Sequence, residues 1–339
     1  MNLSYTDEQN MLRDMVSKFC TSDYDFETRM KTVNSDNGSN PEHWKMFAEL
    51  GLLAIPFSEE QGGLGGGHTD LSLIFEEFGK AIVVEPYLAN VVLAGGVLKR
   101  SNLENADELI AGIVSGETQI SLANYEPMKG FNLDNVDATI SSDGQINGTK
   151  STVLNAGNAD HFLVFGKSGD GYAFGLVNKS SDGVKVVKYK TYDGFVSGDL
   201  VLENCKCDAV FSAENALEIL EETILDAIVC VSSGQLVQWK SHTNSPLNTH
   251  SKESNLANHF LSFRHCSTEW STCSWKQSLQ NHSYSKCLQQ KTLMRKESLS
   301  LVLKIKLVKQ VKLLVKKLCK CMAVWDVQKR CPLVTILRD

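Results

Sequence analysis

Five of the seven residues from Gln61 to Gly67 (QGGLGGG) are glycine, a composition that can hold a phosphate by its backbone N–H groups. A dinucleotide-binding fingerprint must follow a strand and open a helix, and a P-loop needs a Lys-Ser/Thr pair after its glycines. Here the glycines follow a segment with helical character and the pair Ile55-Pro56, and no such lysine pair comes next. We therefore interpret this cluster as a tight loop between two helices.

The residues that could ligate a metal are scattered along the chain. His43, His68 and His161 lie far apart and have no Cys or Asp at ligand spacing. Cys205 and Cys207 are separated by one residue, too few for a zinc knuckle, and no second pair follows nearby. We expect surface or loop histidines, ordinary strand-end cysteines and no metal site.

General acid or base chemistry needs a carboxylate with an unusual environment, and two acidic pairs are candidates. Glu76-Glu77 and Glu221-Glu222 both lie in segments with helical amphipathic spacing. We predict that both pairs belong to solvated helix faces. No Ser/His/Asp nucleophile pattern is present either, so the residues alone assign no catalytic side chain.

Helical periodicity fills residues 1–118, the part of the chain that contains the glycine cluster. Thr6 before Asp7 and Glu8 is a typical N-cap, and Pro41 suits the first turn of a second helix. A polar loop over 33–40 separates these two helices. Three more helices are expected, at Asp70–Ala81, Pro86–Leu98 and Ala106–Ile113.

From about Ile120 the period changes to the alternation of strands. Turn pairs recur every ten to twelve residues: Asp143-Gly144, Asn147-Gly148, Gly157-Asn158, Asp170-Gly171, Asp182-Gly183 and Asp193-Gly194. We predict an antiparallel β-barrel over residues 119–212. Helical character returns in 213–233, so the fold class is α+β: an N-terminal all-α domain, a central barrel and the first helix of a C-terminal bundle.

Composition breaks sharply after Ser233. All 24 glycines lie in residues 1–234, whereas residues 235–339 contain none and carry 18 Lys and Arg against 5 Asp and Glu. The net charge of −6 is therefore an average of an acidic part and a basic part. The acidic charge of residues 1–233 argues against nucleic acid as their partner. A segment of this length without glycine lacks the residue that turns and helix ends need, so we expect no well-packed core there.

The sequence shows no secretory signal and no membrane-spanning segment. The N-terminus, MNLSYTDEQNML, has no basic region followed by an apolar one, and no run of 18 apolar residues occurs. The four cysteines before the break show no disulfide framework. These observations favour a cytoplasmic protein.

Residues 1–233 resemble the acyl-CoA dehydrogenase family. The segment HWKMFAELGLLAIPFSEEQGGLGGG matches the family's signature W-x-x-x-A-E-L-G-L-L-x-I-P-x-x-E-x-x-G-G-x-G. The later segments match the next helix and two flavin-contacting strands. The matching segments are 43–67, Asp70 with 76–81, Gly116-Glu117, 122–127 (LANYEP) and 146–161 (INGTKSTVLNAGNADH).

The resemblance implies an FAD-dependent enzyme that introduces an α,β double bond into an acyl-CoA thioester and passes electrons to an electron-transfer flavoprotein. It also implies a homo- or hetero-oligomer. Residues at the family's flavin-binding positions are Leu122, Asn124, Tyr125, Thr152, Val153 and Leu154. The family often has Trp where this chain has Thr152, and Thr where it has Tyr125 and Leu154.

Residues 234–339 look like the family's C-terminal domain read one nucleotide out of frame. Shifting plausible codons by one base turns Gln235–Lys240 into Ala-Val-Gly-Ala-Met-Glu. The same shift gives further family-like motifs from 252–257, 264–275 and 318–325. We therefore expect an aberrant basic tail and impaired or absent activity. The alternative is a non-enzymatic protein whose cationic amphipathic segment, Leu301–Lys320 within 299–322, binds membrane or RNA.

Overall fold

The computed structural model describes residues 5–101, 103, 105–130, 132–212 and 215–252, the last fourteen of these by their backbone alone. The chain divides into two compact units, Met1–Gln238 and Trp239–Asp339. In the second unit only residues 239–252 are described. The expectations for a helix at 299–322 and for the packing of the basic tail lie outside the described residues.

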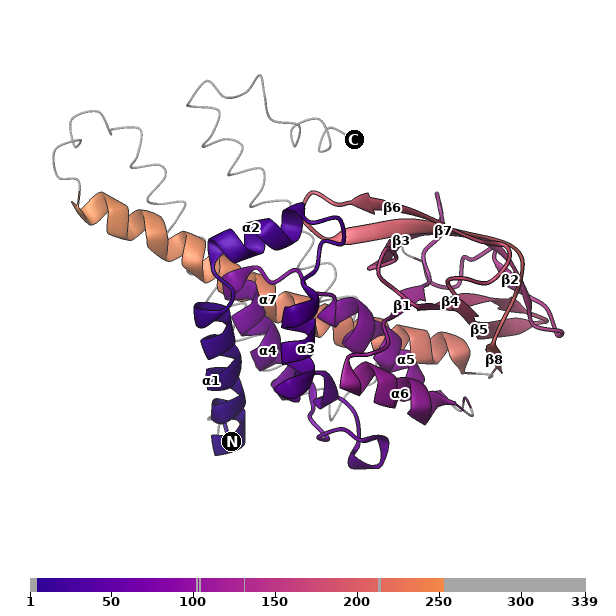
Figure 1. The fold of residues 1–339 in the computed structure, drawn as a ribbon, viewed down its shortest axis with the longest axis horizontal. Coiled ribbons are helices and arrows are strands. Elements are labelled where there is room, and N and C mark those ends of the chain that lie inside the picture. The colour runs from indigo at the N-terminus through magenta and orange to yellow at the C-terminus, as the bar shows by residue number, and fades with distance from the viewer. Residues whose placement is uncertain (1–4, 102, 104, 131, 213–214, 253–339) are drawn as a thin grey trace, which may run out of the picture. The chain divides into compact units, whose positions relative to one another are not determined.

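The N-terminal part of the first unit is helical, as predicted (Figure 1). Thr6 caps the first helix through a capping box with Gln9, and Pro41 begins the third. The elements are α1 (Asp7–Ser22), α2 (Phe26–Asn34), α3 (Pro41–Glu49), η1 (Leu52–Ala54), η2 (Glu59–Gln61), α4 (His68–Ala81), η3 (Leu88–Ala94), α5 (Gly95–Leu98) and α6 (Ala106–Ser115).

Two features of this part differ from the expectation. Helix α2 was not predicted, and it ends inside the segment expected to be a loop; Asp25 caps it by accepting from the Thr28 N–H. The helix expected at Pro86–Leu98 begins at Leu88 as a π-helix and becomes α-helical only at Gly95. The glycine cluster is an interhelical loop, as predicted, since it joins η2 to α4.

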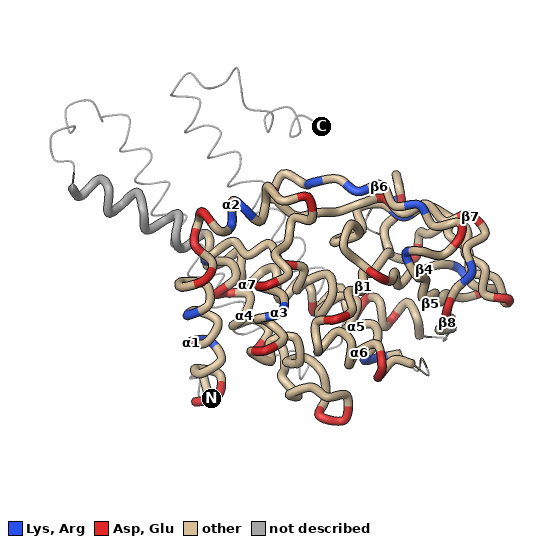
Figure 2. The backbone as a smooth tube through the Cα atoms, in the orientation of Figure 1, with Lys and Arg blue, Asp and Glu red and all other residues tan. Residues whose placement is uncertain are grey.

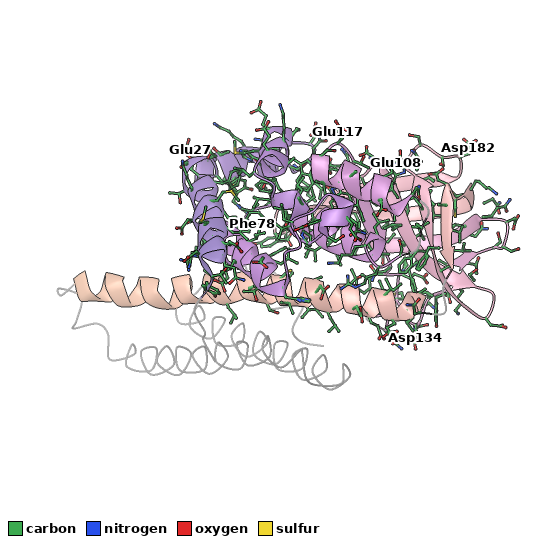
Figure 3. All side chains as sticks on the ribbon, turned by 90° about the horizontal axis from the view of Figure 1, so that it is seen from below. Glu27, Phe78, Glu108, Glu117, Asp134 and Asp182 are labelled. Atoms are coloured by element: carbon green, nitrogen blue, oxygen red, sulfur yellow. The ribbon has the colours of Figure 1, made fainter. Side chains whose placement is uncertain are left out.

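An aromatic cluster forms the centre of the helical part. The Phe47 ring stacks on Phe78 at a centroid distance of 5.2 Å, and Phe19 meets Phe47 edge to face at 5.0 Å. Phe47 and Tyr87 are fully buried, and the Tyr87 hydroxyl donates to the Leu52 carbonyl oxygen. Figure 3 shows Phe78 inside the helical part, whereas Glu108 and Glu117 lie at its periphery. Burial of these rings holds the N-terminal helices together.

Eight strands form one sheet after residue 119 (Figure 1). The order is β6-β7-β3-β2-β4-β5-β8, with β1 also paired to β4. The strands are β1 (Ile120–Ala123), β2 (Thr139–Ile140), β3 (Gln145–Leu154), β4 (His161–Ser168), β5 (Gly171–Asn178), β6 (Val184–Lys190), β7 (Val196–Lys206) and β8 (Ala209–Ser212). Lysines line the outer strand β6, as Figure 2 shows.

The prediction of an antiparallel barrel is wrong in its detail: the sheet is mixed and is not a closed barrel. Strands β1 and β2 both run parallel to β4, and the other pairings are antiparallel. The pairs Asp143-Gly144, Asp170-Gly171 and Asp193-Gly194 lie in antiparallel hairpins, which need few residues between strands. They carry no information about the long segment between β1 and β2, which returns the chain to the sheet in a parallel direction.

Helix α7 (Ala216–Lys252) follows the sheet and is longer than the predicted 213–233. The expected end was placed at the change of composition, but Leu236 and Val237 continue the sequence without a helix-stop signal. Helix α7 crosses α4 closely at two glycines: a Cβ built on Gly79 would lie 2.5 Å from the Gly234 carbonyl oxygen. Among the described residues, no helix has the length and apolar character that crossing a membrane requires.

Candidate functional site: a cavity between the helices and the sheet

A cavity of about 390 Å³ lies between the helical part and the sheet of the first unit. Its helical wall comes from the end of α4, from the segment 82–89 and from residues 231–238 of α7. Its sheet wall comes from the end of β3 and the start of β7, and residues 37–39 close one side. Most of the exposed lining is apolar, which suits an apolar ligand.

The segment 82–89 is held in place by capping and by a buried tyrosine. Ile82 ends α4 with a left-handed backbone (φ 54°), which turns the chain away from the helix axis. The Val84 N–H then donates to the Tyr24 hydroxyl at 3.0 Å. Burial, together with the nearby Glu85 carboxylate, raises the pKa of Tyr24 above its ordinary range, so this hydroxyl stays protonated. Segment 82–89 is therefore held in place by the left-handed end of α4 and by a hydrogen bond to a tyrosine 60 residues earlier in the chain.

A bulge in β3 shapes the sheet wall. Between Lys150 and Val153 the register with β7 shifts, and Thr152 takes a left-handed φ of 54°, which is unusual for a β-branched residue. The Ser151 N–H donates to the Tyr125 carbonyl oxygen at 2.9 Å, and the Thr152 N–H donates to Asp199 Oδ1 at 3.1 Å. The bulge thus joins the segment after β1 to the end of β3.

The structure brings together part of the residues at the family's flavin-binding positions. Thr152 and Leu154 line the cavity. Val153, between them, is buried in the core on the other side of the sheet. Leu122 is buried in the main core and Tyr125 is half-buried, with its pKa raised by burial. Asn124 is buried, and its Nδ2 makes no hydrogen bond to any described residue.

A buried ion pair anchors the chain directly after Asn124 and Tyr125. Glu126 accepts from Lys150 Nζ at 2.7 Å and from the backbone N–H groups of Asp137 and Ala138 at 2.6 and 3.0 Å. Burial opposes the charge on Glu126, but the hydrogen bonds from Lys150 and the backbone outweigh it and lower its pKa. Burial lowers the pKa of Lys150. The sequence analysis gave no role to this pair.

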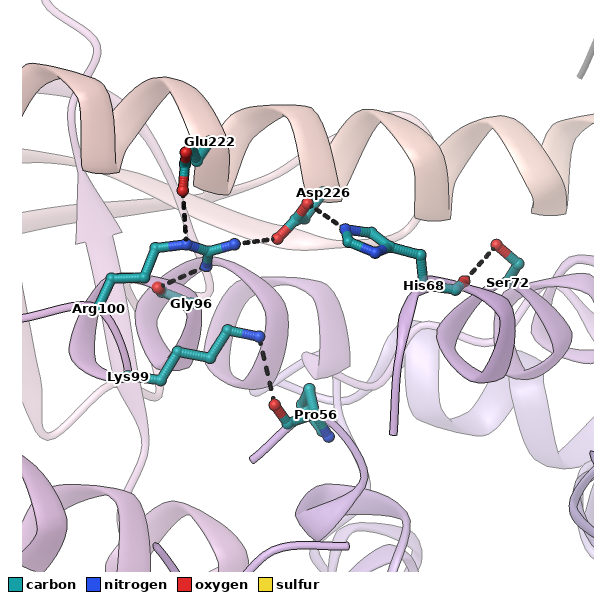
Figure 4. Close-up of polar contacts among 8 residues, drawn as sticks. All are labelled: Pro56, His68, Ser72, Gly96, Lys99, Arg100, Glu222 and Asp226. Atoms are coloured by element: carbon teal, nitrogen blue, oxygen red, sulfur yellow. Dashed lines mark hydrogen bonds and ion pairs between the residues drawn. The ribbon is translucent and has the colours of Figure 1, made fainter. Parts of the chain in front are cut away.

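A second polar cluster fastens α7 to the helices (Figure 4). Asp226 Oδ1 lies 2.6 Å from His68 Nε2, and its Oδ2 accepts from Arg100 Nη2 at 2.5 Å. Arg100 also bonds Glu222 at 3.2 Å and the Gly96 carbonyl oxygen at 2.9 Å. The same close-up shows Lys99 donating to the Pro56 carbonyl oxygen. These contacts connect elements that are far apart in sequence, so we interpret the cluster as a structural brace.

Several side chains expected at the surface are buried or paired. His43 is buried and its Nδ1 lies 2.9 Å from Glu85 Oε1. Glu77 is buried and accepts from Lys80 at 2.5 Å, and Glu222 is half-buried against Arg100. For these residues the expectation was wrong, because each pattern was judged on its own helix while the partner or the covering surface comes from elsewhere. His68 is partly exposed and opens α4.

Cys205 and Cys207 lie at a strand end, as predicted. Cys205 is the second-last residue of β7 and Cys207 follows the strand, and both are buried, free cysteines. Burial raises the pKa of Cys20 and of Cys207 to about 12, so neither thiol is activated as a nucleophile at neutral pH. Within the described part of the chain, no three His, Cys, Asp or Glu residues come together as a metal site.

Comparison with known proteins gives the family. Residues 6–117 match the model of the acyl-CoA dehydrogenase N-terminal domain. The probable acyl-CoA dehydrogenase YngJ of Bacillus subtilis is 32% identical over 180 residues, which cover 50% of this chain and 47% of that protein. The chain spans about half the length of the curated relatives it matches. Residues 6–117 are therefore similar to the N-terminal domain of acyl-CoA dehydrogenases.

Solved structures show the same fold at low sequence identity. The ChsE4-ChsE5 complex of Mycobacterium tuberculosis matches with a TM-score of 0.75 at 21% identity, over 86% of this chain and 80% of that one. The FAD complex of PigA matches with a TM-score of 0.75 at 18% identity, over 86% and 81%. These likenesses show that the shared fold extends beyond the N-terminal domain.

Proposed function

We propose that the first unit is the flavin- and acyl-binding part of an FAD-dependent acyl-CoA dehydrogenase. The observation that supports it is the position of the cavity. Its sheet wall contains Thr152 and Leu154, at the family's flavin-binding positions, and most of its exposed lining is apolar. A flavin and an acyl group must lie against each other for hydride transfer, and a cavity between sheet and helices permits that.

The residues present fit a flavin. The ring system has an apolar face and a polar edge rich in hydrogen-bond acceptors. Asn124 offers a buried side-chain amide beside Tyr125, and Leu154 offers an apolar surface at the end of β3. The bond from Ser151 to the Tyr125 carbonyl holds these two segments together. When bound, the flavin would accept the hydride from the acyl group's β-carbon.

The apolar walls of the cavity would hold the acyl chain and exclude water from it. The substrate would be an acyl-CoA thioester and the electron acceptor an electron-transfer flavoprotein, as in the family. We propose an oligomer, with support from the matched ChsE4-ChsE5 structure, which is a complex. No residue is assigned as the base that removes the α-proton.

We further propose that activity is impaired in this chain as written. The motifs that the family places in its C-terminal bundle, including a glycine-rich segment for the ADP part of FAD, do not occur in residues 235–339. An out-of-frame reading explains their absence and the lack of glycine together. The chain as written is then expected to be colourless and inactive on acyl-CoA.

Titration of FAD into the chain with its frame restored after Ser233 tests the proposed cofactor site. We expect Asn124→Leu to weaken FAD binding by roughly tenfold, because one hydrogen bond is lost at similar side-chain volume. Ser121→Ala is a matched control, since Ser121 is a fully buried residue of β1 with an unpartnered hydroxyl. Equal FAD affinity in wild type and Asn124→Leu would contradict the site.

The alternative function lies in the basic tail. Leu301–Lys320 has the charge and spacing of a cationic amphipathic helix. If this segment has a specific partner, binding to RNA or to anionic vesicles should weaken steeply with salt and should map to 299–322. Binding without specificity would leave the enzyme proposal in place.

A further inference from the structure

The bulge in the sheet wall of the cavity contains backbone N–H groups that the sheet itself does not pair. Between two regular pairs of the β3–β7 ladder, Ser151 and Thr152 together face the single residue Asp199. The extra residue of such a bulge has no ladder partner. The Ser151 N–H donates to the Tyr125 carbonyl oxygen. The Thr152 N–H donates to Asp199 Oδ1 at 3.1 Å, so the Asp199 carboxylate replaces the missing ladder partner.

The neighbouring strand β6 orients the Asp199 carboxylate. The Tyr189 hydroxyl donates to the same oxygen, Asp199 Oδ1, at 3.1 Å. Asp199 lies two residues beyond Ser197, which pairs with the cavity-lining Leu154, so its side chain projects from the cavity face of the sheet. Asp199 is half-buried and is not itself part of the cavity lining. Its influence on the cavity therefore runs through Thr152.

A second bulge in the same β3–β7 ladder shows what is unusual about Thr152. At the second bulge Asn204 has the left-handed backbone, with φ 50°, and its N–H donates to Asn147 Oδ1 at 2.7 Å. Asparagine adopts this conformation readily, whereas a β-branched residue such as Thr152, with φ 54°, is strained by it. Thr152 lines the cavity, and Asn147 and Asn204 do not. The strained bulge thus lies at the cavity, as expected where backbone strain serves a site.

We propose that Asp199, oriented by Tyr189, is a positioning residue for the flavin site: it fixes the left-handed bulge that presents Thr152 to the bound flavin. The flavin as ligand rests on the proposed function; the role of Asp199 in the bulge comes from its two hydrogen bonds. Without an acceptor at position 199 the Thr152 N–H loses its partner, and the backbone returns toward the negative φ that L-residues favour. The peptide group before Thr152 and its side chain then turn, which changes the shape of the sheet wall.

Hydrogen exchange of the full chain as written tests the bulge without any ligand. Asp199→Ala should raise amide exchange in residues 150–154, whereas Asp199→Asn should not, because its Oδ1 still accepts from Thr152. Asn147→Ala is the matched control: it removes the acceptor of the second bulge and should raise exchange around Asn204 instead. Unchanged exchange over 150–154 in Asp199→Ala would overturn the proposal.

FAD titration of the chain with its frame restored after Ser233 tests the role of the bulge in the flavin site. We expect Asp199→Ala to weaken FAD binding by roughly tenfold and Tyr189→Phe by roughly threefold, whereas Asp199→Asn and Asn147→Ala should stay within about twofold of wild type. The absorbance spectrum of the bound flavin should shift in Asp199→Ala and not in Asn147→Ala. A loss of stability alone would not change that spectrum, whereas a changed wall alters the surroundings of the flavin.

Glycine at position 152 separates positioning from a direct effect of the Asp199 charge. Glycine adopts a φ near 54° without strain, so the bulge then depends less on its acceptor. In a Thr152→Gly background, the loss of FAD affinity caused by Asp199→Ala should shrink from roughly tenfold to roughly threefold or less. An undiminished loss would contradict the positioning role. If Asp199→Ala does not fold, Tyr189→Phe and its coupling to Thr152→Gly decide.

The outcomes distinguish this inference from the proposed function. A frame-restored wild-type chain that binds no FAD rejects the proposed function. FAD affinity that falls in Asn124→Leu and stays unchanged in Asp199→Ala rejects this inference alone. An equal loss of FAD affinity in Asp199→Ala and Asn147→Ala would show a general destabilisation of the sheet and would also overturn the inference.

Discussion

At the scale of single residues, the pair of Glu126 and Lys150 decides whether the segment after β1 keeps its place. The Lys150 side chain is completely buried, and Glu126 accepts from it and from two backbone N–H groups. An ion pair in this position adds little net free energy over an apolar pair, but removing one partner leaves a buried charge uncompensated. The pair therefore holds Asn124 and Tyr125 in position.

Replacing Lys150 alone should be strongly destabilising. We expect Lys150→Met to lower the free energy of unfolding by about 3–5 kcal/mol, measured by urea denaturation. Lys185→Met, an exposed lysine of β6, is the control and should change it by less than about 0.5 kcal/mol. The double variant Glu126→Gln with Lys150→Met should recover much of the loss. A small effect of Lys150→Met on the free energy of unfolding would contradict this role of the ion pair.

The same pair should make stability depend on pH in the acidic range. The pKa of Glu126 is lowered in the folded protein, so its contribution is fully present above the unfolded-state value of about 4.3. That contribution is lost as the pH falls through the lower folded value. Unfolding of wild type and Glu126→Gln, measured between neutral and acidic pH, should converge at the acidic end. A constant difference would show that the carboxylate's charge is irrelevant.

The sequence could identify only part of the site at this scale. The family resemblance pointed to Thr152 and Leu154, and both line the cavity, whereas their contact with a flavin stays a prediction. It could not predict that His43 pairs with Glu85 or that Arg100 pairs with Glu222, because those partners are 42 and 122 residues apart. Periodicity reports which face of a helix is polar, but not which distant side chain will cover that face.

At the scale of elements, the crossing of α4 and α7 depends on two glycines. A Cβ on Gly79 would lie 2.5 Å from the Gly234 carbonyl oxygen and 2.7 Å from its Cα. Both neighbours are backbone atoms, so they cannot move aside as a side chain can. The crossing brings α7 close enough for Asp226 to reach both His68 and Arg100.

Gly79→Ala should therefore destabilise the protein although alanine favours helices. In an exposed helix this change would stabilise by up to about 1 kcal/mol. Here the forced separation of α4 and α7 should reverse the sign and lower the free energy of unfolding by about 1–3 kcal/mol. Gly171→Ala is the control, since a Cβ there meets no atom closer than 4.0 Å. Hydrogen exchange should rise in residues 216–238 for Gly79→Ala only; unchanged exchange and stability would refute the close crossing.

Elements were predictable where a local signal exists. Thr6 and Pro41 mark helix starts correctly, and the pairs Asp143-Gly144, Asp170-Gly171 and Asp193-Gly194 mark hairpins correctly. Asn147-Gly148 does not: it lies inside β3, where Gly148 permits the close approach of Ala138, whose Cβ would lie 2.7 Å from an added Cβ. A turn signal and a glycine needed for packing look identical in sequence.

At the scale of the whole molecule, the chain combines a folded first unit, of which residues 6–117 match a known domain family, with a tail of very different composition. The first unit shows how the parts depend on one another: helices supply one wall of the cavity and the sheet supplies the other. The parallel pairing of β1 and β2 with β4 could not be predicted from local turn signals, because the paired residues are far apart in sequence.

The tail should be dispensable for the fold of the first unit. We expect a chain ending at Gln238 to retain the cooperative unfolding of the helical part and sheet, because the cavity walls and both buried clusters lie before that point. Circular dichroism and urea denaturation of the two lengths measure this. A shortened chain that loses cooperative unfolding would show that residues 239–339 contribute essential packing.

Reduction of bound flavin by substrate tests the central claim most directly. The chain with its frame restored after Ser233 is purified and mixed without oxygen with hexanoyl-CoA and octanoyl-CoA, while the flavin absorbance is followed. We predict a yellow oligomer that bleaches with at least one of these thioesters, and a colourless, inactive protein from the chain as written. A restored chain without flavin, or a chain as written that binds flavin stoichiometrically and turns over substrate, would contradict this account.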